Sequence, residues 1–217
     1  MQDFLTVTGM IIGAFPQGEY DRRVTLLTKD QGKITAFVKG ARRQGSRFTA
    51  NTDLFIFGEF DLYVGKNSYT VQDARPLNYF EFLRNDLNAS FYGMYFLEIC
   101  DYYGRENNPE AMLLLNLYRA IQGLKSEKLD NKFVKAVFEL KTFVIEGELI
   151  PPEALGEYKS EVISAVNYIT NSSIEKLYSF ALSEEGTKEL SELADKERRR
   201  IVDRHLKSLD ILEMMAE

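Results

Sequence analysis

At 217 residues the chain is long enough for one large domain or two small ones, and its 45% hydrophobic content allows an ordinary buried core. A formal net charge of -6 excludes a protein coated in positive charge, so any site for a polyanion must be local. The single cysteine excludes an intrachain disulfide and a cysteine-cluster metal site. The amino terminus lacks the basic and apolar regions of a signal peptide, and no stretch approaches the roughly 20 apolar residues that span a membrane. We therefore expect a cytoplasmic protein.

Residues 1–78 are predicted to form five short strands. Each run is rich in β-branched and aromatic residues, and glycine, proline or asparagine stands in the turns between them. The alternation of apolar and polar residues is cleanest after Gly58, and this glycine inside the run predicts a bulge or bend. Five short strands with tight turns are typical of a small closed barrel, of which the OB-fold is the commonest. The strands are expected at residues 4–15, 22–28, 34–39, 54–64 and 68–74.

Residues 79–217 are predicted to be all-helical, because leucine, tyrosine and glutamate accumulate there at helical spacing. Asn108-Pro109-Glu110 and Asp130 are helix start signals, Ser172 to Glu175 matches a capping box, and Pro151-Pro152 interrupts the chain. The overall prediction is a two-domain α+β protein, with an OB-fold barrel followed by a helical domain. Helices are expected at residues 87–104, 108–124, 130–147, 162–169, from 172 onward and at 187–214.

The most unusual stretch runs from Lys29 to Asp53. It contains no acidic residue between Asp30 and Asp53, although the chain as a whole is acidic. A strand-like run, KITAFVK, leads directly into the glycine-flanked loop GARRQGSR, and aromatic residues lie among the bases. OB-folds bind single-stranded nucleic acid through a basic groove and aromatic platforms, so this stretch predicts such a site. A solvated basic loop beside core aromatics is the alternative. The bases are Lys33, Lys39, Arg42, Arg43 and Arg47.

The sequence offers no catalytic constellation. Its one histidine, His205, has no histidine or cysteine beside it, and neither a Walker-type loop nor a dinucleotide fingerprint is present. Glu59 and Asp61 lie on one strand face and could serve as the carboxylates of a metal-dependent nuclease. Acids that alternate with apolar residues are, however, what any half-exposed strand shows. We therefore expect no enzyme and no metal or cofactor.

A second group of bases lies near the carboxyl end, mixed with acidic residues. It is either a solvated helix face or a basic patch for DNA or for an acidic peptide. Its members are Arg198, Arg199, Arg200, Arg204 and Lys207.

Three motifs in the amino-terminal part stand in the order and spacing of a known family. They are the turn Gly18-Glu19-Tyr20-Asp21-Arg22, the hairpin TKDQGK at residues 28–33, and KGARR at residues 39–43. On these motifs the chain resembles RecO, the family of bacterial recombination mediators. The resemblance is specific over residues 1–77 and diffuse over the helices, although HLKSL at residues 205–209 also fits the family.

The resemblance implies an OB-fold domain at residues 1–78 and a helical domain at residues 79–217. It implies binding of single- and double-stranded DNA, annealing of complementary strands, and a nucleoid-associated location. It also implies cooperation with RecR in loading RecA onto DNA covered by single-strand-binding protein, whose acidic carboxyl-terminal tail would be contacted. The implied DNA contacts are Lys39, Arg42, Arg43 and Arg47, supported by Arg22, Arg23 and Lys33.

One departure from the family concerns zinc. Many members carry a four-cysteine zinc site in the second domain, whereas PPEALGEY at residues 151–158 contains no cysteine, which identifies a zinc-less variant. Other packing must then hold residues 150–190 together. We expect the pocket for the acidic tail on the helical domain, near Arg198, Arg199, Arg204 and Lys207. The alternative function is a protein-interaction adaptor with little direct DNA binding.

Overall fold

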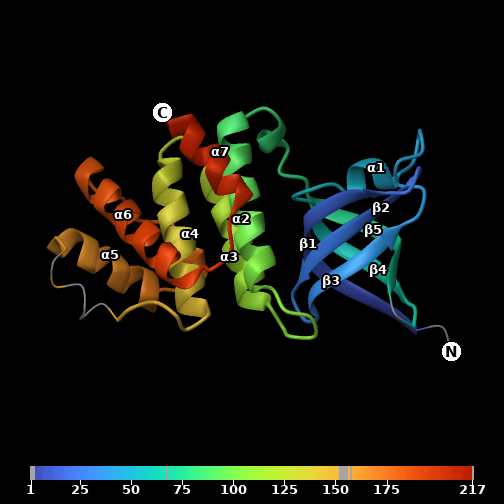
Figure 1. The fold of residues 1–217 in the computed structure, drawn as a ribbon, viewed down its shortest axis with the longest axis horizontal. Coiled ribbons are helices and arrows are strands. Elements are labelled where there is room, and N and C mark those ends of the chain that lie inside the picture. Colours follow the sequence, from blue (N-terminus) through green and yellow to red (C-terminus); the bar gives the residue numbers. More distant parts are fainter. Residues whose placement is uncertain (1–2, 67, 152–155, 157, 217) are drawn as a thin grey trace. The chain divides into compact units, whose positions relative to one another are not determined.

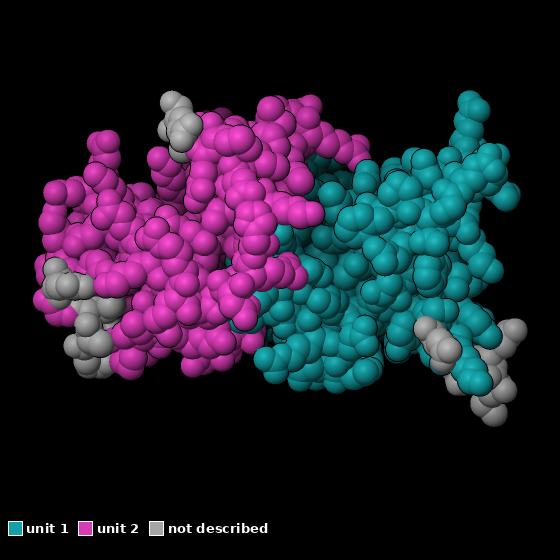
Figure 2. All heavy atoms as spheres, viewed as in Figure 1, with its two compact units in different colours: residues 1–81, 97–114 teal, residues 82–96, 115–217 magenta. Residues whose placement is uncertain are grey.

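The chain forms two compact units. The computed structural model describes residues 3–66, 68–151, 156 and 158–216. The barrel unit comprises residues 1–81 and 97–114, and the helical unit comprises residues 82–96 and 115–217 (Figure 2). Asn67 of the predicted fourth turn, Pro152 of the predicted break and most of PPEALGEY lie outside the described residues. Among the helices described, none is long and apolar enough to cross a membrane.

The barrel unit contains a closed barrel of five strands, which confirms the predicted OB-fold (Figure 1). The strand order is β1-β2-β3-β5-β4, and all neighbours are antiparallel except β3 and β5, which are parallel. The register shifts at Gly58, where the sequence predicts a bulge. The strands are β1 (Asp3–Gln17), β2 (Asp21–Thr28), β3 (Gly32–Val38), β4 (Phe57–Val64) and β5 (Tyr69–Asn78).

The predicted start of the fourth strand is wrong by three residues. Phe55 adopts a left-handed backbone with φ 68°, which interrupts the extended run before Phe57. Its amide donates to the Ile11 carbonyl, and the Ile11 amide donates to the Ile56 carbonyl. This segment is therefore bonded to β1 in an irregular turn. A four-residue helix, α1 (Phe48–Asn51), precedes it and was not predicted.

A bulge in β1 decides which of its side chains face the barrel core. The register with β2 shifts between Ile11 and Gly13. Before the shift Val7 and Ile11 point inward, whereas after it Ala14 does. Because the alternation of a strand has a period of two, one extra residue exchanges its faces. Phe15 therefore points outward and is 50% exposed.

The segment after helix α2 (Leu87–Tyr103) pairs with the β2–β3 hairpin. Lys33 N donates to Arg105 O at 2.9 Å, and Asn107 N donates to Gln31 O at 3.1 Å. Glu110 N donates to Lys29 O at 3.1 Å. This pairing holds residues 105–110 in a non-helical turn against the hairpin, so helix α3 (Ala111–Leu124) begins at Ala111 and not at the predicted Pro109.

The helical unit is built around one apolar core on helix α4 (Asn131–Ile145). The Asp130 side chain accepts a hydrogen bond from Lys132 N, so the predicted start of α4 is confirmed. The predicted capping box at residue 172 leads only to a 3-10 turn at Ile174–Lys176, because the chain then bends and Phe180 packs against Phe133. Two further helices pack on this core, α5 (Ser160–Asn171) and α6 (Glu184–Ile201). A short helix at Glu81–Arg84 precedes α2.

The predicted last helix, residues 187–214, is wrong. It is two helices, α6 and α7 (Lys207–Ala216), separated at residues 202–206. Leu190 and Leu206 are both buried. At 3.6 residues per turn a continuous helix would place them about 160° apart, on opposite faces. The interruption allows both side chains to reach a core.

Residues 160–183 are held without cysteine ligands. The Lys141 ammonium, which is buried, donates to Ile169 O at 2.9 Å and to Ser172 O at 2.8 Å at the carboxyl end of α5. A cation satisfies carbonyls there that lack partners within the helix. The Glu161 carboxylate accepts from the amide and hydroxyl of Ser183 at 2.7 and 2.8 Å. These bonds fix both ends of the segment against the apolar core.

Candidate nucleic-acid interface

The basic loop, residues 39–47, is pinned against the β1–β2 turn. Gly40 N donates to Asp21 Oδ1 at 2.8 Å, and Arg42 N donates to Tyr20 O at 2.9 Å. Ala41 is buried, and its carbonyl accepts from the Thr49 hydroxyl at 2.8 Å. The loop therefore has a defined position, although most of its side chains are exposed.

The arginines of the loop are exposed and are oriented by aromatic rings and carbonyls. Arg43 lies over the Tyr20 ring at 5.3 Å, and Arg47 lies over Phe48 at 4.9 Å. Arg42 donates to Gly18 O at 3.1 Å. Arg47 also forms an ion pair of 3.2 Å with Asp73, but its side chain is 65% exposed. Each arginine has five N–H donors, so these contacts leave donors for phosphate.

Two of the predicted DNA-binding residues hold the fold together. Arg22 donates to the carbonyls of Thr49 and Thr52 at 3.1 and 2.8 Å, at the end of α1. Lys33 donates to the main-chain carbonyl of Asp101 at 2.6 Å and forms an ion pair of 3.2 Å with its carboxylate. Both side chains are half-buried. The other five predicted residues, Arg23, Lys39, Arg42, Arg43 and Arg47, are exposed.

A row of outward side chains crosses three strands beside the basic loop. Phe15 of β1 pairs with Arg23 of β2, which pairs with Phe37 of β3. The Arg23 guanidinium lies 5.3 Å from the centre of the Phe15 ring. A groove of about 320 Å³, lined in part by Arg23 and Phe37, continues to Tyr69. Phe15 is not among the site residues predicted from the sequence, although Gly13 inside the strand is a signal for the bulge that turns it outward.

Glu59 and Asp61 are bound in an ion-pair cluster. Arg75 contacts Asp61 at 2.5 and 3.0 Å, Glu59 at 3.4 Å and Asp73 at 3.2 Å. The Thr6 hydroxyl donates to Asp61 Oδ1 at 2.7 Å. The hydrogen bonds from Arg75 and then from Thr6 lower the pKa of Asp61 to about 2. The carboxylates thus form ion pairs on the outer face of the barrel, as expected for a half-exposed strand.

Because this pKa is lowered, the Arg75–Asp61 pair is expected to stabilise the barrel above about pH 4 and to lose this effect as the pH falls towards about 2. The stability difference between the wild type and an Arg75→Met variant should therefore shrink from about pH 5 to about pH 2. Asp61 is one-third exposed, so the whole difference should be about 1 kcal/mol or less. Urea titrations at several pH values measure it. A difference that does not change with pH would contradict this prediction, and Arg84→Met is an exposed control.

The carboxyl-terminal bases do not form one stripe. The Arg198 side chain is only 11% exposed and lies 3.5 Å from carboxylates of both Glu139 and Asp195. Arg199 is exposed on α6. Arg204 and Lys207 are also exposed, but they lie in and after the interruption between α6 and α7.

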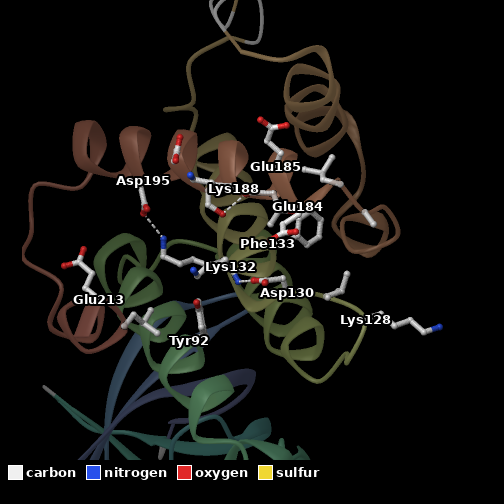
Figure 3. A pocket seen from close by; sticks show the side chains of 18 of the residues that line it. Tyr92, Lys128, Asp130, Lys132, Phe133, Glu184, Glu185, Lys188, Asp195 and Glu213 are labelled. Atoms are coloured by element: carbon white, nitrogen blue, oxygen red, sulfur yellow. Dashed lines mark hydrogen bonds and ion pairs between the residues drawn. The ribbon is translucent and has the colours of Figure 1, made fainter. Parts of the chain in front are cut away.

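A pocket of about 960 Å³ lies in the helical unit (Figure 3). Leu129, Phe133, Leu182 and Leu212 provide apolar walls. Acidic and basic side chains both line it, and the close view shows among them Asp130, Lys132 and Asp195. The four residues predicted for an acidic peptide are not among the described residues that line this pocket.

Comparisons with known proteins agree with the fold. Residues 1–80 match the family model described as Recombination protein O N terminal. A protein named DNA repair protein RecO from Acetivibrio thermocellus is 25% identical, and the match covers 98% of both chains. The protein of the same name from Clostridium kluyveri is 26% identical, over 97% of this chain and 95% of the relative. That from Clostridium novyi is 32% identical, over 59% of this chain and 50% of the relative. Residues 1–80, which contain the closed barrel, thus match the amino-terminal domain of the RecO family, and the similarity to proteins named RecO extends over the helices that follow.

Proposed function

We propose that this protein binds DNA and anneals strands as a mediator of recombinational DNA repair. The observation that carries the proposal is the exposed basic loop beside the β1–β2 turn of an OB-fold, in a chain whose net charge is -6. Lys39, Arg42, Arg43 and Arg47 are the proposed phosphate contacts, with Arg23 beside them. Arg22 and Lys33 contribute by holding the loop and the hairpin in place.

Annealing needs no covalent step in this proposal. Two complementary strands repel each other through their phosphates, and cations on a fixed loop lower that repulsion. The relatives are named DNA repair proteins, which supports a role in repair. We assign DNA binding to the domain of residues 1–78 and partner binding to residues 79–217. Within repair, the chain would act with RecR to load RecA onto DNA coated by single-strand-binding protein, in the nucleoid.

The acidic tail of single-strand-binding protein is the proposed partner peptide of the helical domain. Exposed Arg199, Arg204 and Lys207 would attract its carboxylates. Arg198 would act indirectly, because it forms ion pairs with Glu139 and Asp195.

Fluorescence anisotropy with a labelled oligonucleotide tests DNA binding. We expect a dissociation constant in the micromolar range and a log–log salt slope of about -2.8 if the four loop cations meet phosphates. Arg42→Ala/Arg43→Ala should weaken binding about tenfold and should make the slope shallower by about 1.4, since two contacts are lost.

The control variant is Lys125→Ala/Lys128→Ala, which removes the same charge from exposed positions of the helical unit. Equal losses in both double variants would contradict a site on the loop. A flat salt response would contradict the electrostatic basis. Absence of binding by the wild type would favour the adaptor, in which the helical domain does the main work.

A further inference from the structure

The row formed by Phe15, Arg23 and Phe37, here called the platform, has the composition of a stacking surface. Cross-strand partners project from the same face of a sheet, so the three side chains lie side by side on the outside of the barrel. Phe15 is 50% exposed and Arg23 is exposed, with its guanidinium over the Phe15 ring. Aromatic rings and guanidinium planes are the protein groups on which nucleobases stack.

The next row towards the β2–β3 hairpin leaves space for a ligand at its Thr35 end. The row consists of Gly13, Thr25 and Thr35, which are paired across the same three strands. At its other end the Phe15 ring lies against Gly13, where an added Cβ would be 3.0 Å from the ring. The groove of about 320 Å³ includes Thr35 in this row and is bounded by Phe37 and Tyr69.

The platform also lies within reach of the basic loop. Phe15 and Arg23 are each two residues from the strand ends that flank the β1–β2 turn, a distance of about 7 Å along a strand. The loop packs against that same turn through Arg42 N and Tyr20 O. One strand of DNA could therefore contact the loop with its phosphates and the platform with its bases.

We propose that the platform takes unpaired bases of single-stranded DNA, whereas the basic loop takes phosphates of single strands and duplexes alike. This inference rests on the proposed DNA binding and divides it between two surfaces. Duplex bases are paired and stacked on each other, so they have no free face for Phe15 or Phe37. Their phosphates remain accessible to Arg42 and Arg43. Preference for single strands is thus a property of the platform.

The test compares a single-stranded oligonucleotide with a duplex of the same length by fluorescence anisotropy. Phe15→Ala/Phe37→Ala should bind the single strand about tenfold more weakly and the duplex within about twofold of the wild type. Arg42→Ala/Arg43→Ala should lose affinity for both. Phe4→Ala is the control, because Phe4 is 63% exposed on the same strand but packs against Tyr63 at its other end.

A second measurement does not depend on how the variants fold. The wild-type protein is titrated with an oligonucleotide of abasic sites, which keeps the phosphates and removes the bases. It should bind about tenfold more weakly than the normal single strand. Equal affinity for both probes, or equal losses of single strand and duplex in the platform variant, would overturn the inference and leave DNA binding intact. Absence of binding to every probe would instead overturn the proposed function.

Discussion

Replacing Glu139 by alanine is expected to destabilise the helical unit by about 3–5 kcal/mol, the cost of removing one partner from a buried group of charges. The Glu139 side chain is fully buried in the middle of α4. Its carboxylate accepts hydrogen bonds from Lys135 Nζ at 3.0 Å and from the Tyr95 hydroxyl, and Arg198 lies 3.5 Å away. No other acid is present on α4.

Without Glu139, two cations would remain close together with few means of compensation. The Lys135 and Arg198 side chains are 12% and 11% exposed. Burial alone would lower the pKa of Lys135, but the charges of Glu139 and Asp195 outweigh it and raise that pKa. Among the described residues, Asp195 would remain as the carboxylate paired with both, and it is 39% exposed. The Tyr95 hydroxyl, buried beside them, would lose its acceptor.

Urea unfolding followed by circular dichroism at the helix band measures the effect. Glu192→Gln on α6 is the control, since Glu192 is exposed, and its stability should be within about 0.5 kcal/mol of the wild type. Glu139→Gln, which keeps the shape of the side chain, should lie between Glu139→Ala and the control. A loss below about 1 kcal/mol for Glu139→Ala would show that the buried charges compensate one another without it.

The second large effect is expected at Gly32, where Gly32→Ala should cost about 2–5 kcal/mol of barrel stability. Gly32 has a φ of +68°, and a Cβ atom there would lie 2.0 Å from Arg105 O and 2.4 Å from Asn108 O. Backbone atoms cannot rotate away as a side chain can. The alanine variant must therefore move residues 105–108 off the hairpin, which would break the bonds that Lys33 N and Gln31 O make with that segment.

The Gly18→Ala variant separates the cost of a left-handed backbone from the cost of the steric clash. Gly18 has a similar φ of +60°, but nothing lies within 4 Å of a Cβ placed there. This variant should lose only about 1–2 kcal/mol, the cost of the left-handed backbone. Amide hydrogen exchange of residues 29–33 and 105–110 is the local measurement. Exchange should accelerate in Gly32→Ala and remain unchanged in Gly18→Ala. Unchanged exchange in both would contradict the argument.

The fold was predictable where local patterns decide it. The five strands follow from runs of β-branched residues between turn residues, and the N-cap residue Asp130 predicts the start of α4. The interruption at residues 202–206 was not predictable, because the helical spacing of charged residues continues through this segment. The physical reason for the interruption, the burial of Leu206, is known only from the structure. Likewise, the pairing of residues 105–110 with the hairpin depends on contacts between segments about 70 residues apart.

The region of the site was predictable from the sequence. Which of its residues are exposed and which hold the fold together was not. The absence of acids between Asp30 and Asp53 directs attention to the basic loop. Composition does not reveal that Lys33 forms an ion pair with Asp101, or that Arg23 is exposed and lies over the Phe15 ring. Both contacts depend on residues that are distant in the sequence. The roles of the seven predicted DNA contacts stay predictions for the binding experiments.

The bulge in β1 has a consequence for how this protein can change during evolution. The register shift between Ile11 and Gly13 leaves Ile12 as an extra residue, and β1 is paired in register with β2 on either side of it. Loss of the Ile12 codon would keep Ile11 opposite Leu26 and Gly13 opposite Thr25, so Ala14 would still face the interior and Phe15 would still point outward. The length of β1 can therefore change by one residue at the bulge without exchanging the two faces of the strand.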